Sequence, residues 1–176
     1  MTFHTIREAH QGEAEAVCTV LEQSFREYVG ILDPPSGVFA ETVASLADRI
    51  ARNEILVCDV AGELVGCAFC TPDDSFLYVG RFGVLPEWRQ SGVGSLLLAA
   101  AENRARALGY RHARLNVRAS LRDLQQYYER RGYRPVELLS HEGYAGPTYM
   151  QMEKVLDEQI SNRSIGQDSE GKSRCP

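Results

Sequence analysis

The stretch Val84-Leu85-Pro86-Glu87-Trp88-Arg89-Gln90-Ser91-Gly92-Val93-Gly94-Ser95 decides the fold. It joins a run typical of a strand, residues 76–85, to a run typical of a long helix, residues 92–108. Glycines let the backbone of such a turn approach a ligand and leave successive N–H groups pointing outward. These groups and the positive end of the helix dipole favour an anion, and a diphosphate matches the geometry.

Two familiar phosphate motifs do not fit this turn. The dinucleotide fingerprint G-x-G-x-x-G/A needs a small residue where Leu97 stands, and no lysine follows either glycine as a P-loop requires. What remains is R-x-x-G-x-G placed directly after V-x-P at the end of a strand. A purely structural glycine turn is the alternative interpretation.

The hydrophobic pattern on both sides of the turn predicts one mixed α/β domain. The predicted order is β-α-α-β-β-β-α-β-α-β-β, a mixed sheet of about six to seven strands flanked by about four helices. The strand-helix-strand unit over 76–117 predicts parallel neighbouring strands. The remaining predicted elements are a strand at Thr2–Arg7, helices at 12–29 and 40–52, a hairpin of 55–60 and 64–70 around Gly62-Glu63, a strand at 113–117, a helix opened by a capping box of Ser120 and Asp123 and closed by Gly132, and strands at 133–139 and 148–155.

Length and composition fit a single soluble domain. The chain has 176 residues, of which we assign 1–156 to the domain and 157–176 to a polar, disordered tail. No apolar run is long enough for a membrane helix, and the first eight residues lack the apolar core of a signal peptide. We therefore expect a cytoplasmic protein. Cys67 and Cys70 have CxxC spacing inside a strand, where buried packing is the simpler interpretation than a metal or redox site.

The charges are unevenly distributed. Residues 1–103 carry a balance of −9 and residues 104–134 a balance of +7, and only two of the 19 basic residues are lysines. A solvated helix face is one interpretation of the basic segment, and an anionic ligand is the other. Because arginine binds phosphate through two parallel hydrogen bonds, the composition favours a phosphate-bearing partner. A nucleic-acid surface is disfavoured by the overall pI of about 5.4 and the absence of a recognition motif.

Four motifs in order along the chain resemble the GNAT superfamily of N-acetyltransferases. Residues 89–94 resemble its [QR]-x-x-G-x-[GA] signature, and residues 84–86 resemble the preceding V-x-P. The L-x-V strand is similar to residues 115–117, and the Y-x-x-x-G-[FY] helix end is similar to residues 128–133. The resemblance covers about residues 1–156 and implies the GNAT fold with acetyl-CoA as co-substrate and no metal.

The chain departs from the family pattern ahead of Tyr128. Family members often carry Asn and then Ala there, whereas this chain has Leu121 and Leu124, so a cofactor contact through the Asn side chain is lost. Leu121, Leu124 and Tyr128 share one helix face, and Tyr127 lies about 100° away, so Tyr128 is the inward tyrosine.

The resemblance implies a binding site for the donor along the turn. Backbone N–H groups of the turn bind the pyrophosphate, and the strand before it pairs with the pantetheine arm like an added strand. For Arg89 a plain surface role is the alternative. The residues expected to bind the cofactor are Phe82, Val84, Leu85, Arg89, Gln90, Ser91, Gly92, Val93, Gly94 and Ser95.

The resemblance also implies an acid that protonates the departing thiolate. Tyr128 occupies the family position, and a tyrosine with a pKa of ~10 is protonated at neutral pH. The alternative is a core aromatic. An alkylammonium acceptor also needs a base, but the strand 76–85 lacks the Glu that many family members place there. No base is assigned among the candidates Glu27, Asp33, Glu41, Asp73, His141 and Glu142.

The expected function is transfer of an acetyl group from acetyl-CoA to a primary amine of a small molecule or peptide, by direct attack in a ternary complex. A non-catalytic acyl-CoA-binding regulatory module is the alternative. The acidic first part favours a cationic acceptor, whereas Arg81 favours one with a carboxylate. The family resemblance also allows a homodimer, and no nucleic acid or membrane partner is expected. Residues expected to bind the acceptor are Phe25, Tyr28, Tyr78, Arg81 and His141, with Phe39 and Tyr144 as further candidates.

Overall fold

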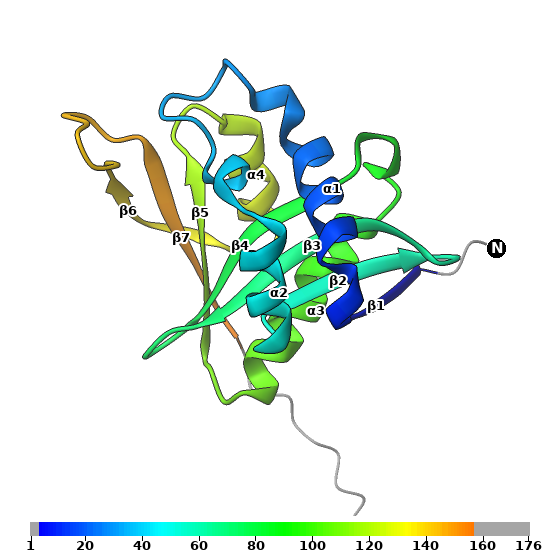
Figure 1. The fold of residues 1–176 in the computed structure, drawn as a ribbon. Helices are drawn as coiled ribbons and strands as arrows, with labels where there is room; N and C mark the ends of the chain where they lie inside the picture. Colours follow the sequence, from blue (N-terminus) through cyan, green and yellow to red (C-terminus); the bar gives the residue numbers. More distant parts are fainter. Residues whose placement is uncertain (1–3, 157–176) are drawn as a thin grey trace, which may run out of the picture.

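The computed structural model describes residues 4–156 (Figure 1). Within them the predicted element order is confirmed. The expected tail, 157–176, lies outside the described residues. The elements are β1 His4–Glu8, α1 Ala14–Phe25, α2 Val43–Ala51, β2 Ile55–Val60, β3 Glu63–Pro72, β4 Leu77–Val84, α3 Val93–Ala107, β5 His112–Arg118, α4 Arg122–Glu129, β6 Arg134–Leu139 and β7 Tyr149–Val155.

The strands form one sheet in the order β1-β2-β3-β4-β5-β7-β6. β4 and β5 are parallel, as the strand-helix-strand pattern predicts, and every other pair is antiparallel. The sheet is therefore mixed. In the described part of the chain, no helix is long and apolar enough to cross a bilayer.

Helices cover both faces of the sheet (Figure 1). Two glycines on the paired strands β3 and β4 show how closely the helices approach the sheet. A Cβ on Gly83 of β4 would lie 3.0 Å from the Cβ of Ser24 in α1, and one on Gly66 of β3 would lie 2.9 Å from the Cδ1 of Leu97 in α3. The sheet is thus sandwiched between α1 with α2 on one side and α3 on the other.

The CxxC cysteines belong to the core of this sandwich. Cys67 and Cys70 lie on β3 and are fully buried. Burial raises the pKa of each thiol to about 12. Because the reactive form of cysteine is the thiolate, both are inert packing residues, as the sequence predicted.

The start of α4 differs from the predicted capping box. The residue preceding the helix is Leu121, and neither Ser120 nor Asp123 forms a cap. The Leu121 N–H instead bonds to the Arg118 carbonyl at 3.0 Å, which closes a turn directly after β5. The Gln125 side chain donates to the same carbonyl at 3.0 Å, so this buried amide ties α4 to the end of β5. At the other end Gly132 has a φ of +91°, as its predicted terminating role requires.

β4 and β5 separate soon after they pair. Their ladder contains only Leu77 with Ala113 and Tyr78 with Arg114. β4 also carries a bulge against β3 at the step from Phe69 to Cys67. The two parallel strands therefore splay apart toward their carboxyl ends, which is where α/β sheets bind ligands.

Replacing Glu13 by Gln makes the free energy of unfolding depend less on pH in the acid range. Arg7 donates to both Glu13 oxygens at 2.9 and 2.7 Å, and these bonds lower the pKa of Glu13 to about 2. A lowered carboxyl pKa stabilises the fold above the unfolded-state value of ~4.3, and this contribution is lost as the pH falls toward 2. We expect E13Q to lower the free energy of unfolding by about 1–2 kcal/mol at pH 7.

Urea unfolding of both proteins between pH 7 and pH 2.5 measures this effect. The difference should shrink as the pH falls below ~4.3, because the unfolded wild-type chain then binds a proton at Glu13 while the folded protein, with its pKa of about 2, still resists protonation. Glu15→Gln, which removes an exposed carboxylate from the first turn of α1, is the matched control and should change stability by less than about 0.5 kcal/mol. A difference that is constant with pH would contradict the assigned role of Glu13.

Candidate active site

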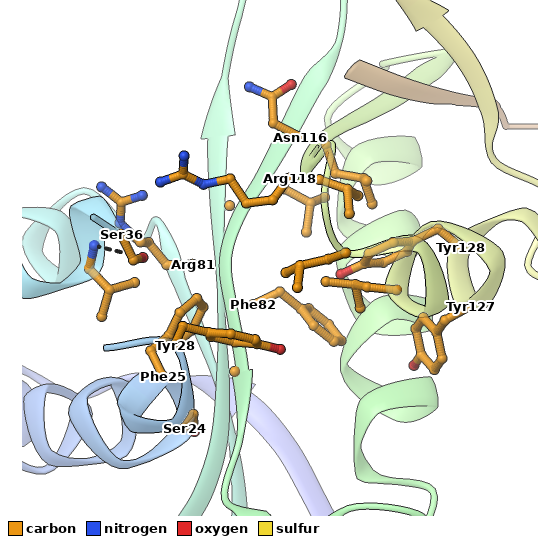
Figure 2. A pocket seen from close by; sticks show the side chains of 18 of the residues that line it. Ser24, Phe25, Tyr28, Ser36, Arg81, Phe82, Asn116, Arg118, Tyr127 and Tyr128 are labelled. Carbon is orange, nitrogen blue, oxygen red and sulfur yellow. Dashed lines mark hydrogen bonds between the residues drawn. The ribbon is translucent and has the colours of Figure 1, made fainter. Parts of the chain in front are cut away.

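A large cleft opens where β4 and β5 separate (Figure 2). Its volume is about 1240 Å³, and it is lined by α1, β4, β5, α4, the start of α3 and the loops after α1 and β6. A space of this size accommodates a long cofactor and a second substrate together, since ordinary ligand pockets measure ~300–1,000 Å³.

The start of α3 forms one end of the cleft. Leu96 makes the first backbone bond of the helix, to Gly92 at 3.0 Å, so the three preceding N–H groups have no partner inside it. Gln90 and Gly92 have φ values of +62° and +94°, the left-handed region that suits glycine and strains glutamine. Val93 is fully buried and anchors the turn. The result is a rigid group of outward N–H donors suited to an anion.

Arg131, two residues after the end of α4, contacts this turn. Its guanidinium lies 3.5 Å from the centre of the Tyr127 ring and donates to the Ser95 hydroxyl at 2.8 Å. The space at Gly94 is limited, because an added Cβ would lie 3.0 Å from the Tyr127 hydroxyl oxygen. Glycine at 94 thus allows α4 to approach the helix start, and Arg131 adds positive charge there.

Arg89 points toward α1 as well as lining the cleft. Its guanidinium donates to the Ser24 carbonyl at 2.9 Å and forms an ion pair with Glu27 at 2.6 Å. The side chain of Arg89 therefore fixes the turn to α1. Glu27 thus pairs with the charge of an arginine that the sequence analysis placed among the cofactor-binding residues.

The open edge of β4 forms the floor of the cleft. Beyond Tyr78 no β5 residue pairs with it, so its backbone is available on that side. Phe82 and Val84 line the cleft there, although the Val84 carbonyl already accepts from Arg89 at 3.3 Å. Leu85 is buried, and its N–H bonds to Val65 at 2.9 Å. Of the ten expected cofactor residues, the cleft is lined by Phe82, Val84, Arg89, Gln90, Gly92, Gly94 and Ser95, and not by Leu85, Ser91 or Val93.

Tyr128 is the inward tyrosine of α4, as predicted from the helix face. It is 4% exposed, and its ring packs edge-on against Phe82 and Tyr133. Figure 2 shows its hydroxyl directed into the cleft, whereas that of Tyr127 points toward α3. Burial raises the pKa of Tyr128 above its usual value of 10. The side chain therefore keeps its proton at neutral pH and can donate it.

All five expected acceptor residues line the same cleft. Phe25 comes from the end of α1 and Tyr28 from the 3-10 turn directly after it, Tyr78 and Arg81 come from β4, and His141 comes from the loop after β6. The two further candidates do not line it. Phe39 is exposed, and the Tyr144 hydroxyl is bonded to Asp33.

Comparison with known proteins identifies the family. The model of the Acetyltransferase (GNAT) family matches residues 15–133, more than half of the chain. The chain belongs to the GNAT family. No curated protein matches the sequence significantly.

Solved GNAT structures share this fold. The PaiA N-acetyltransferase from Thermoplasma acidophilum, in complex with coenzyme A, is 19% identical with a TM-score of 0.73, over 87% of this chain and 99% of that one. Ard1 from Thermoplasma volcanium is 23% identical with a TM-score of 0.72, over 88% and 99%. The ribosomal-protein-S18-alanine N-acetyltransferase from Escherichia coli is 15% identical with a TM-score of 0.66, over 91% and 98%.

The structure of this GNAT domain narrows the candidates for a base. Of the six carboxylate and imidazole groups considered, only His141 and Glu142 line the cleft. Glu27 and Glu41 are paired with Arg89 and Arg81. The pKa of His141 is lowered by burial and by the nearby Arg118, so its ring is neutral at pH 7.

Sequence reasoning missed three arginines of the GNAT cleft, at positions 118, 130 and 131. Arg130 and Arg131 lie in the Y-x-x-x-G segment but were seen only as part of the basic run. Arg118 is the last residue of β5, directly after the L-x-V motif. Its position at the carboxyl end of a parallel strand is the signal that would have found it.

Proposed function

We propose that this protein is an acetyl-CoA-dependent N-acetyltransferase that acts on the primary amine of a small molecule or peptide by direct attack in a ternary complex. One observation carries the proposal. A single cleft connects the N–H groups at the start of α3, the open edge of β4 and the protonated hydroxyl of Tyr128. These are the groups that diphosphate binding, pantetheine pairing and thiolate protonation require.

The proposed reaction has one chemical step. The neutral amine attacks the thioester carbon, a C–N bond forms, and the C–S bond breaks. Tyr128 donates its proton to the departing sulfur, and the proton that the amine nitrogen loses is returned to the Tyr128 phenolate, which restores the neutral tyrosine. The products are the N-acetylated amine and coenzyme A, with atoms and charge balanced.

Two observations support this route over an acyl-enzyme. None of the four cysteines described, at positions 18, 58, 67 and 70, lines the cleft. A thiol is the side chain that exchanges most readily with a thioester, and none of these four thiols is placed to accept the acetyl group. The cleft is also large enough to hold both substrates together. The coenzyme A complex of the Thermoplasma PaiA enzyme supports the choice of donor.

Two-substrate kinetics test the proposal. Release of the CoA thiol from acetyl-CoA is measured against a panel of amines, with both substrate concentrations varied. Intersecting double-reciprocal lines are expected for a ternary complex. Parallel lines would contradict direct attack, and release that no amine stimulates would favour the non-catalytic acyl-CoA-binding module.

A further inference from the structure

The charge of the cleft settles a conflict between two hints in the sequence. The acidic first part of the chain favours a cationic acceptor, but its acids do not line the cleft. Glu41 and Glu27 form ion pairs with Arg81 and Arg89, two arginines that line it. The cleft itself is lined by five arginines and two acids, namely Arg81, Arg89, Arg118, Arg130, Arg131, Asp123 and Glu142. Arg81 and Arg89 are themselves paired with Glu41 and Glu27, so the excess positive charge comes from the three other arginines, which outnumber the two acids of the lining. An anionic ligand fits this excess better than a polyamine does.

Part of this positive charge lies away from the start of α3. Arg81 precedes the end of β4 by three residues, which is roughly 10 Å along a strand. Arg118 ends β5, on the other side of the opening. Figure 2 shows both side chains extending toward the segment that contains Ser36. Tyr78 and His141, two of the residues expected to bind the acceptor, line the cleft close enough for the charges of Arg81 and Arg118 to act on them.

The backbone and the neighbours of Arg81 hold its guanidinium at the cleft. It has a φ of +45°, an uncommon value for a residue with a side chain, at the bulge of β4. Its Nε donates to Glu41 at 3.1 Å, and Nη2 lies where an added Cβ on Gly37 would be only 2.9 Å away. Glu41 thus holds one edge of the guanidinium, and glycine at 37 leaves room for the rest. The Nη groups remain to bind a ligand in the cleft.

Arg118 supplies a second positive charge. Its Nη2 donates to the carbonyls of Pro34 and Pro35 at 2.7 and 3.0 Å, and Nη1 is buried without a partner. Arg118 forms no ion pair with a carboxylate of residues 4–156. Asp33 is close enough to act on it, but that carboxylate accepts from Tyr144. A partly buried cation without a paired anion favours an anion nearby.

We propose that the acceptor carries a carboxylate beside its amine, as an amino acid does, and that the Nη groups of Arg81 bind this carboxylate in the field of Arg118. The inference rests on the proposed acetyl transfer and names its substrate class. Two parallel N–H···O bonds from a guanidinium match a carboxylate. Polyamines and aminoglycosides, which carry only positive charge, are repelled by the same pair.

Pairs of matched acceptors test the proposed substrate class. L-phenylalanine is compared with phenethylamine and with phenylalaninamide, and L-lysine with cadaverine. Each set keeps the carbon skeleton of the amine and removes the carboxylate charge. We expect kcat/KM, measured by CoA-thiol release, to be at least about 30-fold higher for the carboxylate-bearing members. Equal or better use of the carboxylate-free amines would overturn the inference while leaving acetyl transfer established.

Variants of Arg81 test its role in binding the carboxylate. Arg81→Met should raise KM for the carboxylate acceptors by about 30-fold or more, remove the preference within each set and leave KM for acetyl-CoA unchanged. Arg81→Lys should restore part of the preference. Because R81M leaves Glu41 without its partner, the double variant R81M/E41Q is measured too. Arg134→Met, an exposed arginine of β6 outside the cleft, should keep the wild-type preference. A preference that survives in R81M and in the double variant would overturn the role of Arg81.

A binding measurement separates the two proposals. Thermal unfolding of the wild-type protein saturated with CoA is followed with L-phenylalanine or phenethylamine added. Stabilisation by the amino acid alone is expected. If no amine stimulates CoA release, the proposed function fails, and this experiment still decides the carboxylate preference. Equal stabilisation by both compounds, or none, would contradict the preference.

Discussion

Replacing Tyr128 by Phe lowers kcat by about 100-fold or more, and the affinity for acetyl-CoA stays within about twofold. The change removes one oxygen from a buried ring and keeps its contacts with Phe82 and Tyr133. What is lost is the proton that the hydroxyl holds at neutral pH, because burial raises its pKa. Steady-state kinetics give kcat, and calorimetric titration with acetyl-CoA gives the affinity.

Tyr133→Phe is the matched control for this variant. Tyr133 is also buried, its pKa is also raised by burial, and it contacts Tyr128, but it does not line the cleft. We expect Y133F to keep kcat within about threefold, whatever it does to stability. An unchanged kcat in Y128F, or equal losses in the two variants, would remove Tyr128 from the mechanism.

Replacing Gly94 by Asp weakens acetyl-CoA binding by about 100-fold or more. The new carboxylate would stand at the start of α3, where the free N–H groups are expected to bind the pyrophosphate, and like charges repel at short range. The fold should tolerate the change. An acid in the first turn of a helix is favourable, and the closest atom to the new Cβ is the end of the Tyr127 side chain. Calorimetric titration with CoA measures the loss.

Leu96→Asp is the control for that variant. Leu96 lies two residues further along the same helix, is 44% exposed and does not line the cleft. The net charge of L96D equals that of G94D, so a general charge effect would appear in both. We expect L96D to bind CoA within about threefold of wild type. Similar losses in both variants, or no loss in G94D, would place the phosphates elsewhere.

The fold could be predicted from the sequence because its local signals agree. Strand and helix periods alternate clearly, and Gly109 and Gly132 end their helices with positive φ as expected. The start of α4 could not be predicted, because the turn at Arg118 is held by a hydrogen bond from Gln125, which lies inside the helix. A side chain that reaches back seven residues leaves no signature in a local motif.

The sequence predicted the backbone features of the site better than the directions of its side chains, and the reason is physical. Backbone-based features such as the glycine turn are visible in sequence, because few residues satisfy their geometry. Side-chain direction depends on distant partners. Arg89 is turned toward α1 by Glu27, and Arg81 is held by Glu41 across forty residues. Arg118 reaches the loop after α1 through Pro34, a contact 84 residues apart that no pattern along the chain reveals.

Identification of the product tests the central claim most directly. The protein is incubated with acetyl-CoA labelled in its acetyl group and with the matched amino acids and amines, and both products are quantified by mass spectrometry. We predict labelled N-acetyl product in an amount equal to the CoA released, with formation of both slowed together in Y128F. Bound acetyl-CoA that yields no acetylated amine, or CoA release by hydrolysis alone, would contradict acetyl transfer in this cleft.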